Sequence, residues 1–167
     1  MSYPPQGYSG TGEISAVMRL VDGQPPDLEI GEGSQLQYLV TGAMTSGELG
    51  LYHCKFLGPP SGADPHYHKT ISEWFYIEAG TVQFYDGDRW VDRTQGGFLF
   101  LPRGGIHGFR NVSGEPASML LGFVPGREDR EEFFQGFADL AAGRWRPKSR
   151  EEFDAFMREH DNFLVAA

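Results

Sequence analysis

The sequence has only one cysteine, Cys54, and few cationic side chains. A single cysteine excludes a disulfide within the chain and suits a reducing compartment, so we expect a cytoplasmic protein. Lys and Arg number 14 against 23 Asp and Glu, and the net charge of −9 argues against a nucleic-acid partner, because phosphate binding requires a cationic surface. No apolar run reaches the roughly 18 residues of a membrane-spanning helix, and no secretory signal is visible, so no membrane partner is expected.

Glycine and aromatic residues are abundant instead, with 23 glycines and 14 % Phe, Trp and Tyr. The 167 residues suffice for one domain. Short apolar or aromatic runs alternate with Gly, Pro and Asp clusters, which predicts strands at residues 16–21, 36–40, 49–57, 74–77, 82–85, 90–91, 98–101 and 119–124. Asp86-Gly87 between two of these runs indicates a hairpin. Turns every 8–12 residues or so favour an all-β sandwich or barrel.

The end of the chain changes character. Phe133, Phe134 and Phe137 recur at helical spacing, and Ser149 with Glu152 forms a capping box that predicts a second helix. We expect these helices to pack on the barrel. The predicted organisation is a flexible arm (residues 1–12), a β-barrel (residues 13–126) and a C-terminal helical extension (residues 127–167).

Three of the five histidines fall into one pattern with an acidic residue. His66 and His68 are two residues apart, which on a strand directs both imidazoles to one face. Glu73 follows closely, and His107 lies in a separate predicted strand. Three imidazoles and one carboxylate can bind a first-row transition metal, provided that all four point into one cavity.

These residues resemble the two motifs of the cupin superfamily. The first motif is matched by His66-x-His68-x4-Glu73-x6-Gly80, except that Pro60 stands where the leading glycine is usual. The second is matched at every fixed position, by Gly96-x5-Pro102-x-Gly104-x2-His107-x3-Asn111. The resemblance implies a double-stranded β-helix, the jelly-roll barrel of cupins, with a metal ion inside it. It implies His66, His68, Glu73 and His107 as metal ligands.

A narrower resemblance concerns the small, single-domain cupins similar to quercetin dioxygenase. It rests on short strings, namely residues 107–111, residues 124–126 and the acidic, Phe-rich residues 131–134. It implies an enzyme that binds one divalent ion (Fe, Mn, Ni, Co, Cu or Zn) and no organic cofactor. The implied reaction is dioxygenation of an aromatic or polyketide-like enolisable small molecule by O2, with Glu73 as ligand and general base.

Two alternatives stay open at this point. The same centre could catalyse cyclisation, isomerisation or decarboxylation of a polyketide-like substrate without O2. The second alternative is a cupin that binds a small molecule without catalysing a reaction.

We also expect a homodimer, because the exposed edge strands of a small barrel tend to pair with another chain.

Strand alternation suggests which side chains line the substrate pocket. Phe75 and Ile77 share the face of Glu73, and Phe109 shares the face of His107. For residues 49–57 the sequence leaves open which alternate residues face inward, that is, the parity of the strand. The inward set is either Tyr52, Cys54 and Phe56 or Leu51, His53 and Lys55. Our pocket candidates are Phe75, Ile77, Phe109, Tyr52 and Phe56.

Overall fold

The computed structural model describes residues 7–12, 16, 19–127 and 129–165. The strands and helices within these residues are β1 (Leu28–Ile30), β2 (Ser34–Val40), η1 (Ala43–Thr45), β3 (Gly50–Phe56), β4 (Ser61–Tyr67), β5 (Ser72–Ala79), β6 (Thr81–Tyr85), β7 (Trp90–Thr94), β8 (Phe98–Leu101), β9 (His107–Asn111), β10 (Ala117–Val124), α1 (Arg130–Ala141), α2 (Arg150–Glu159) and β11 (Phe163–Leu164). No described helix is long and apolar enough to cross a bilayer.

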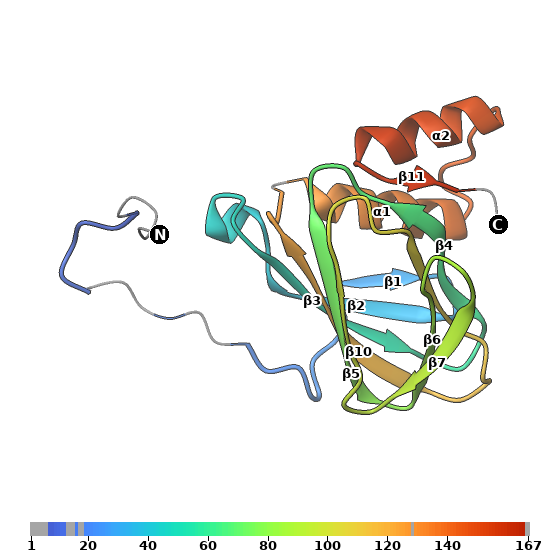
Figure 1. Cartoon of the computed structure of the whole chain (residues 1–167), viewed down its shortest axis with the longest axis horizontal. Helices are drawn as coiled ribbons and strands as arrows, with labels where there is room; N and C mark the ends of the chain where they lie inside the picture. The colour runs from blue at the N-terminus through green and yellow to red at the C-terminus, as the bar shows by residue number, and fades with distance from the viewer. Residues whose placement is uncertain (1–6, 13–15, 17–18, 128, 166–167) are drawn as a thin grey trace.

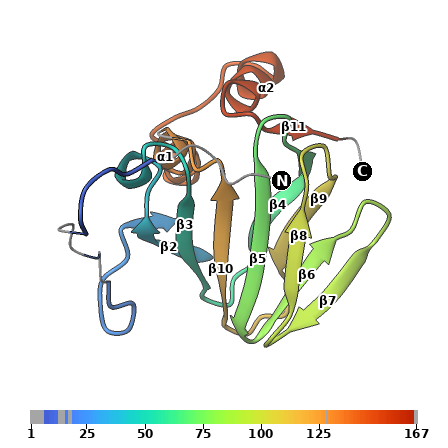
Figure 2. The same cartoon turned by 60° about the vertical axis from the view of Figure 1, so that its left-hand side comes forward.

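Two antiparallel sheets face each other and enclose the core (Figures 1 and 2). One sheet has six strands in the order β1-β2-β3-β10-β5-β8, and the other has five in the order β11-β4-β9-β6-β7. Strands that are distant in the sequence are neighbours, as when β10 lies between β3 and β5. The predicted all-β jelly-roll barrel with two C-terminal helices is therefore confirmed.

The alternation of side chains along β5 and β3 determines which residues face the interior of the barrel. On β5, Glu73, Phe75 and Ile77 are buried, as their shared face requires. On β3 the ambiguous parity is resolved in favour of Tyr52, Cys54 and Phe56, which are buried, whereas Lys55 is exposed. His53 points to the other face but is also buried, because Gln37 and Glu78 contact its two ring nitrogens.

The hairpin expected at Asp86-Gly87 joins β6 to β7. The Asp86 carboxylate accepts hydrogen bonds from the backbone N–H groups of Asp88 and Arg89, and the Asp86 N–H donates to the carbonyl of Arg89. Gly87 has a φ of 99°, a conformation that other residues rarely adopt. The sequence signal was correct, and the loop is four residues long.

The N-terminal part of the chain differs from expectation. No described residue between 16 and 27 belongs to a strand, so the strand expected at residues 16–21 is absent from its described positions, and β1 begins only at Leu28. Residues 22–26 contain a turn and two prolines, which cannot donate backbone hydrogen bonds to a sheet. Half of the predicted arm, residues 1–6, lies outside the described residues.

The C-terminal extension covers one end of the barrel (Figure 2). The Ser149 hydroxyl accepts a hydrogen bond from the N–H of Glu152, so the predicted helix start is confirmed. Beyond α2 the chain returns to the barrel, where β11 pairs with β4 and sets Leu164 opposite His66. This added strand was not predicted, and it brings the extension against the segment that carries two of the motif histidines.

Gly122 on β10 gives a test of how side chains pack across the six-stranded sheet. A Cβ atom at this position would collide with the indole of Trp74 on the neighbouring strand β5. Because strands hold their register, we expect Gly122→Ala to destabilise the fold by about 1–3 kcal/mol, lowering the melting temperature by roughly 3–10 °C. Differential scanning calorimetry measures this. Gly7→Ala, where an added Cβ meets no atom within 4 Å, is the control, and an equal melting temperature in both variants would contradict the packing.

Candidate metal centre

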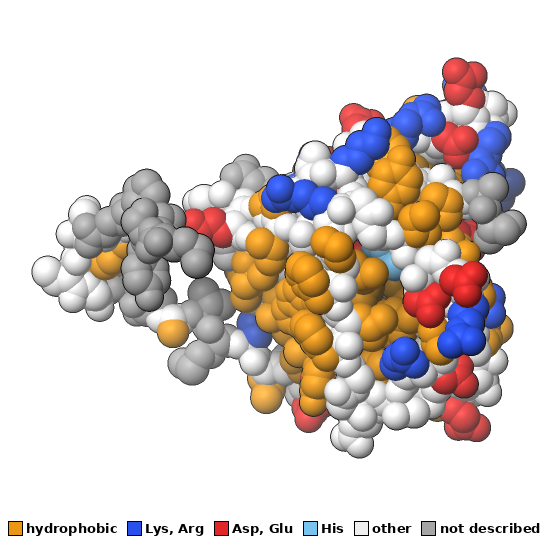
Figure 3. Space-filling view, in the orientation of Figure 1, with side chains coloured by type: hydrophobic (Ala, Val, Ile, Leu, Met, Phe, Trp, Pro, Cys, Tyr) orange, Lys and Arg blue, Asp and Glu red, His pale blue; other side chains and the backbone are white. Residues whose placement is uncertain are grey.

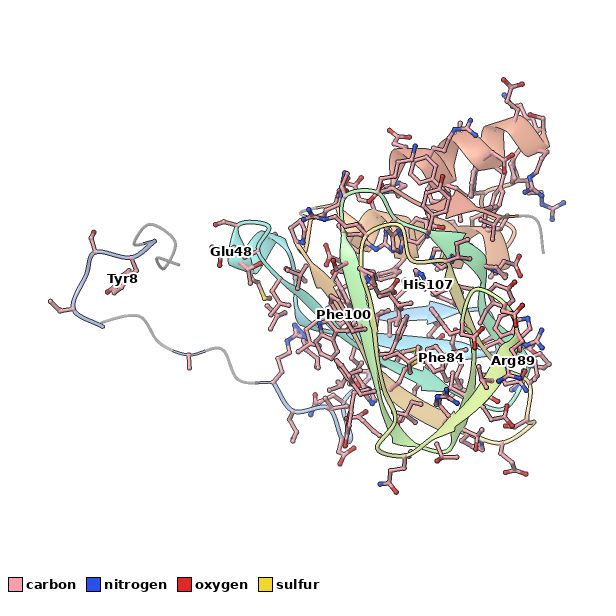
Figure 4. The ribbon with its side chains drawn as sticks, viewed as in Figure 1. Tyr8, Glu48, Phe84, Arg89, Phe100 and His107 are labelled. Carbon is pink, nitrogen blue, oxygen red and sulfur yellow. The ribbon has the colours of Figure 1, made fainter. Side chains whose placement is uncertain are left out.

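The structure brings the four motif residues together inside the barrel. His66 is on β4, His68 follows that strand directly, Glu73 is on β5 and His107 begins β9. Each offers one ligand atom, and these atoms all lie within 4.8 Å of one another. His66 and His107 are cross-strand partners in one sheet, whereas Glu73 comes from the opposite sheet. The cluster therefore bridges the two sheets, and Figure 4 shows His107 in the barrel interior.

Backbone carbonyls orient all three imidazoles in the same way. The Nδ1 atoms of His66, His68 and His107 lie 2.7, 2.6 and 2.9 Å from the carbonyl oxygens of residues 64, 161 and 105. A carbonyl can only accept a hydrogen bond, so each Nδ1 carries the proton. Nε2 is then the atom through which each ring can bind a metal, once the ion has displaced any proton that Nε2 carries. Outer hydrogen bonds of this kind fix the tautomer and raise the basicity of histidine ligands.

The buried Glu73 carboxylate holds the cluster together. Its Oε2 lies 2.6 Å from Nε2 of His107 and 3.1 Å from Nε2 of His68. Burial favours the neutral acid, but the two histidines outweigh it and hold the pKa of Glu73 well below its usual range. For His107, burial is likewise outweighed by the Glu73 carboxylate, which raises the pKa of the imidazole. Burial lowers the pKa of His66 to about 3, so this ring is neutral.

This arrangement fits a divalent transition-metal ion. Donor atoms that share one first-row ion at about 2.0–2.2 Å lie within roughly 4.4 Å of one another, close to the spread of the four atoms here. Imidazole and carboxylate donors suit these metals. A metal ion displaces protons from its ligands when it binds, and the close contact between Nε2 of His107 and the Glu73 carboxylate is a place where a cation can take the position of a proton. The four residues could therefore hold a metal ion.

Asp161, between α2 and β11, supports this cluster, and no sequence pattern predicted that role. Its carbonyl is the acceptor for His68, and its carboxylate accepts hydrogen bonds from the backbone N–H groups of Lys69 and Thr70 and from the Thr70 hydroxyl. These bonds fix the turn that follows His68. Asp161 is 93 positions from His68 and has a φ of 57°, which aspartate tolerates near a helix end.

A cavity of about 300 Å³ adjoins the cluster. His66 and Glu73 form part of its wall, and the rest comes from β1 to β4, β9, β10 and the C-terminal extension. Its apolar lining consists of Ile30, Leu36, Cys54, Phe56, Ala63, Phe109, Leu121, Phe123, Phe133, Phe134, Phe137, Phe153, Met157 and Leu164. A pocket of this size and character is suited to a small organic molecule.

Two of the five pocket candidates line this cavity, namely Phe56 and Phe109. The other three, Tyr52, Phe75 and Ile77, are fully buried and are not part of its wall. Tyr52 packs edge-on against Phe134 and its hydroxyl donates to Glu131, so the helical extension covers it. Phe75 and Ile77 lie within the packed core, where Phe75 contacts the rings of Phe84 and Phe109. The helices instead supply the lining that strand parity did not predict.

Removing the Asp161 carboxylate gives a test of its supporting role. We expect Asp161→Ala to weaken metal binding about 10–100-fold, as the loss of outer hydrogen-bonding partners typically does, because the turn after His68 loses three hydrogen bonds. Competition with a chelator of known affinity measures the change. Asp154→Ala, which removes a partly exposed carboxylate paired with Arg150 on α2, should leave metal affinity unaltered. Equal affinities in the two variants would refute this role for Asp161.

Comparison with known proteins agrees with this geometry. Residues 57–123 match the cupin domain family. No curated protein is significantly similar in sequence. Among solved structures, KdgF from Halomonas sp. aligns with a TM-score of 0.57 at 18 % identity, over 69 % of this chain and 99 % of its own.

Two further structures align less closely. A predicted oxalate decarboxylase from Thermotoga maritima has a TM-score of 0.50 at 24 % identity, over 55 % of this chain and 80 % of its own. The cupin domain of Cnp3 from Schizosaccharomyces pombe has a TM-score of 0.50 at 11 % identity, over 64 % and 75 %. At these identities the likeness concerns the fold. Residues 57–123 therefore match the cupin domain family, and the jelly-roll barrel that contains them is similar in fold to solved cupin structures.

Proposed function

We propose that this protein is a metal-dependent enzyme that oxygenates an aromatic or polyketide-like, enolisable small molecule. The observation that carries the proposal is the position of the cluster in the wall of an apolar cavity, where His66 and Glu73 meet the aromatic lining. His66, His68, Glu73 and His107 would hold the ion. A divalent first-row ion at this place supplies Lewis acidity to an enol oxygen and, for redox-active metals, reactivity with O2.

The residues of the chain contribute proton transfer and exclusion of water. Glu73 lies at the cavity wall with a carboxylate that is ionised, so it can take the hydroxyl proton of an enol at Oε1 or Oε2. His107 and His68 orient this carboxylate through their Nε2 atoms. The phenylalanines around the cavity keep bulk water away from the deprotonated substrate, which strengthens the electrostatic contacts inside.

Oxygen consumption tests this proposal. Purified protein loaded separately with Fe, Mn, Ni or Co is offered a panel of flavonols and other aromatic enols in an oxygen-electrode cell. We expect O2 uptake that requires both metal and substrate. Turnover that persists under anaerobic conditions would instead assign a cyclase, isomerase or decarboxylase activity to the same centre. Ligand binding without turnover under either condition would leave a binding protein.

We also propose that the chain forms a homodimer through the free edge of the six-stranded sheet. β8 ends this sheet, and no other described strand pairs with its outer edge. Phe98 and Phe100 on β8 are 62 % and 60 % exposed, and hydrophobic side chains gather on the same face (Figure 3). Exposed edges and apolar patches favour association. Light scattering after size exclusion should give twice the chain mass, and a monomer at high concentration would refute the dimer.

A further inference from the structure

The cavity contains buried polar atoms that have no partner in the protein. Among the described residues, three buried side-chain atoms lack a hydrogen bond: Oγ of Ser61, Nε of Arg130 and Oδ1 of Asn162. All three residues line the cavity beside the metal cluster. Buried polar groups are almost always hydrogen-bonded, because leaving one unpaired costs about 1–3 kcal/mol. Three such atoms, all on residues of one cavity wall, make this cavity the candidate site for a polar ligand.

Arg130 is the most unusual of the three. It is only 3 % exposed, and its guanidinium lies 4.3 Å from the ring centroids of both Phe123 and Phe133. Its Nη1 donates to the carbonyl of His160 at 3.1 Å. None of the ion pairs among the described residues includes it. Burial lowers the pKa of Arg130 to about 10, so the side chain is still cationic at neutral pH.

A buried cation without an anionic partner is costly, because the aromatic faces and one carbonyl replace only part of its hydration. The nearby charge of Glu73 favours the cationic form, but that carboxylate is engaged by His107 and His68. Nε of Arg130 is thus a charged donor that has no acceptor among the described residues, on a side chain that lines the cavity. An ionised oxygen on the ligand would supply the missing partner.

Asn162 offers the complementary group. It is 3 % exposed, and its backbone N–H is bonded to the carbonyl of Met157, which fixes the residue at the end of α2. Its unpaired Oδ1 can only accept, so it requires a donor such as a hydroxyl. Ser61 on β4 adds a third polar group that can donate or accept. The lining also includes Ser34, the acidic Asp64 and the cluster residues His66 and Glu73, and the remainder is mostly aromatic and aliphatic.

We propose that the cavity selects an aromatic ligand that bears an ionised oxygen, as a carboxylate or a phenolate, which Arg130 binds, together with a hydroxyl that donates to Asn162. This inference rests on the proposed function for its statement that the ligand is a substrate. The Phe123 ring lies 4.3 Å from the Arg130 guanidinium and 6.3 Å from the His68 ring, measured between centroids for the two rings. Arg130 therefore anchors the anionic end of the ligand close to the cluster.

Matched binding probes test the charge preference. Calorimetry of the full-length protein compares 2-naphthoate with 2-naphthamide, which has nearly the same shape but no charge, and 1-naphthol with 4-nitro-1-naphthol, whose phenolate forms more readily. We expect the carboxylate to bind at least about tenfold tighter than the amide, the range for a hydrogen bond to a charged group. Equal affinities for 2-naphthoate and 2-naphthamide would overturn the inference without any variant. The naphthol pair distinguishes a phenolate ligand from a carboxylate ligand.

Variants assign the preference to Arg130. In Arg130→Gln the ratio of the two affinities should fall to about one, while binding of the neutral amide stays within about threefold of the wild type. Arg130→Lys should keep part of the preference, and Arg150→Gln, at an exposed arginine on α2, should keep all of it. Circular dichroism establishes that each variant is folded. An unchanged ratio in folded Arg130→Gln would refute the role of Arg130.

Asn162→Leu tests the hydroxyl partner independently. The wild type should bind 6-hydroxy-2-naphthoate, whose hydroxyl is on the far ring, more tightly than 2-naphthoate by a factor of about ten, and Asn162→Leu should lose that advantage while retaining the preference for the anion. No advantage of the hydroxyl in the wild type would overturn the assignment of Asn162.

Each titration is repeated after treatment with a chelator, because a carboxylate could also bind a metal ion directly. We expect the anion preference to persist in the metal-free protein. A preference that appears only with metal present would contradict the assignment to Arg130. A charge preference without any O2 uptake would refute the oxygenase proposal alone, whereas O2 uptake on neutral substrates without a charge preference would refute this inference alone.

Discussion

Replacing His107 with alanine is expected to remove most of the metal-binding capacity of the protein. His107 is 1 % exposed, and its Nε2 is one of the four donor atoms that converge in the barrel. The substitution removes one donor and also the closest partner of the Glu73 carboxylate, 2.6 Å away. We therefore expect the affinity for a divalent transition metal to fall by more than about 100-fold, which exceeds the typical effect of losing an outer partner. Chelator competition on the purified variant measures it.

The control for this variant is His53→Ala. His53 is also a buried histidine, but it contacts Gln37 and Glu78 and lies outside the cluster. If metal affinity falls in His107→Ala but not in His53→Ala, the result supports one ion that is bound by all four residues of the cluster. If both variants bound metal as tightly as the wild type, the cluster would be a hydrogen-bonded network of the core and not a metal centre.

Replacing Glu73 with glutamine should have the largest effect on turnover. The substitution keeps the size of the side chain but removes both the negative charge and the basic oxygen. General acid–base groups contribute about 10²- to 10⁴-fold to rates, so we expect the rate per bound metal ion to fall by that factor at saturating metal. Steady-state O2 consumption, normalised to metal content, gives the measurement.

Glu78→Gln is the matched control, because Glu78 lies on the same strand, faces the other side of the sheet and pairs with His53. We expect its rate to stay close to that of the wild type. Full activity in Glu73→Gln would show that the general-base assignment is wrong, even if the residue helps to bind the metal. Equal losses in both variants would point to damage to β5 and not to lost proton transfer.

The barrel and the cluster were accessible from the sequence for physical reasons. Strands enforce a two-residue period, so the spacing of His66 and His68 already placed their side chains on one side. The fixed spacings around Glu73 and His107 carried the resemblance to cupins, and the observed convergence of the four donor atoms agrees with it. The buried face of β5 followed from the same alternation.

The cavity and its supporting residues were not accessible in this way. Strand parity tells which side of a sheet a residue faces, but not how far it lies from the open end of the barrel. Phe75 and Ile77 face inward and yet belong to the packed core, whereas Phe56 and Phe109 reach the cavity. The roles of Asp161 and Arg130 depend on how the C-terminal helices dock, which is a tertiary contact that no local pattern of the sequence encodes.

Elemental analysis of the purified wild-type protein tests the central claim most directly. After reconstitution with Fe, Mn, Co, Ni, Cu or Zn in turn and removal of excess ion, inductively coupled plasma mass spectrometry gives the number of metal ions per chain. The four converging donors of His66, His68, Glu73 and His107 predict about one ion per chain for at least one of these metals. A protein that is folded but retains none of the six would contradict the account.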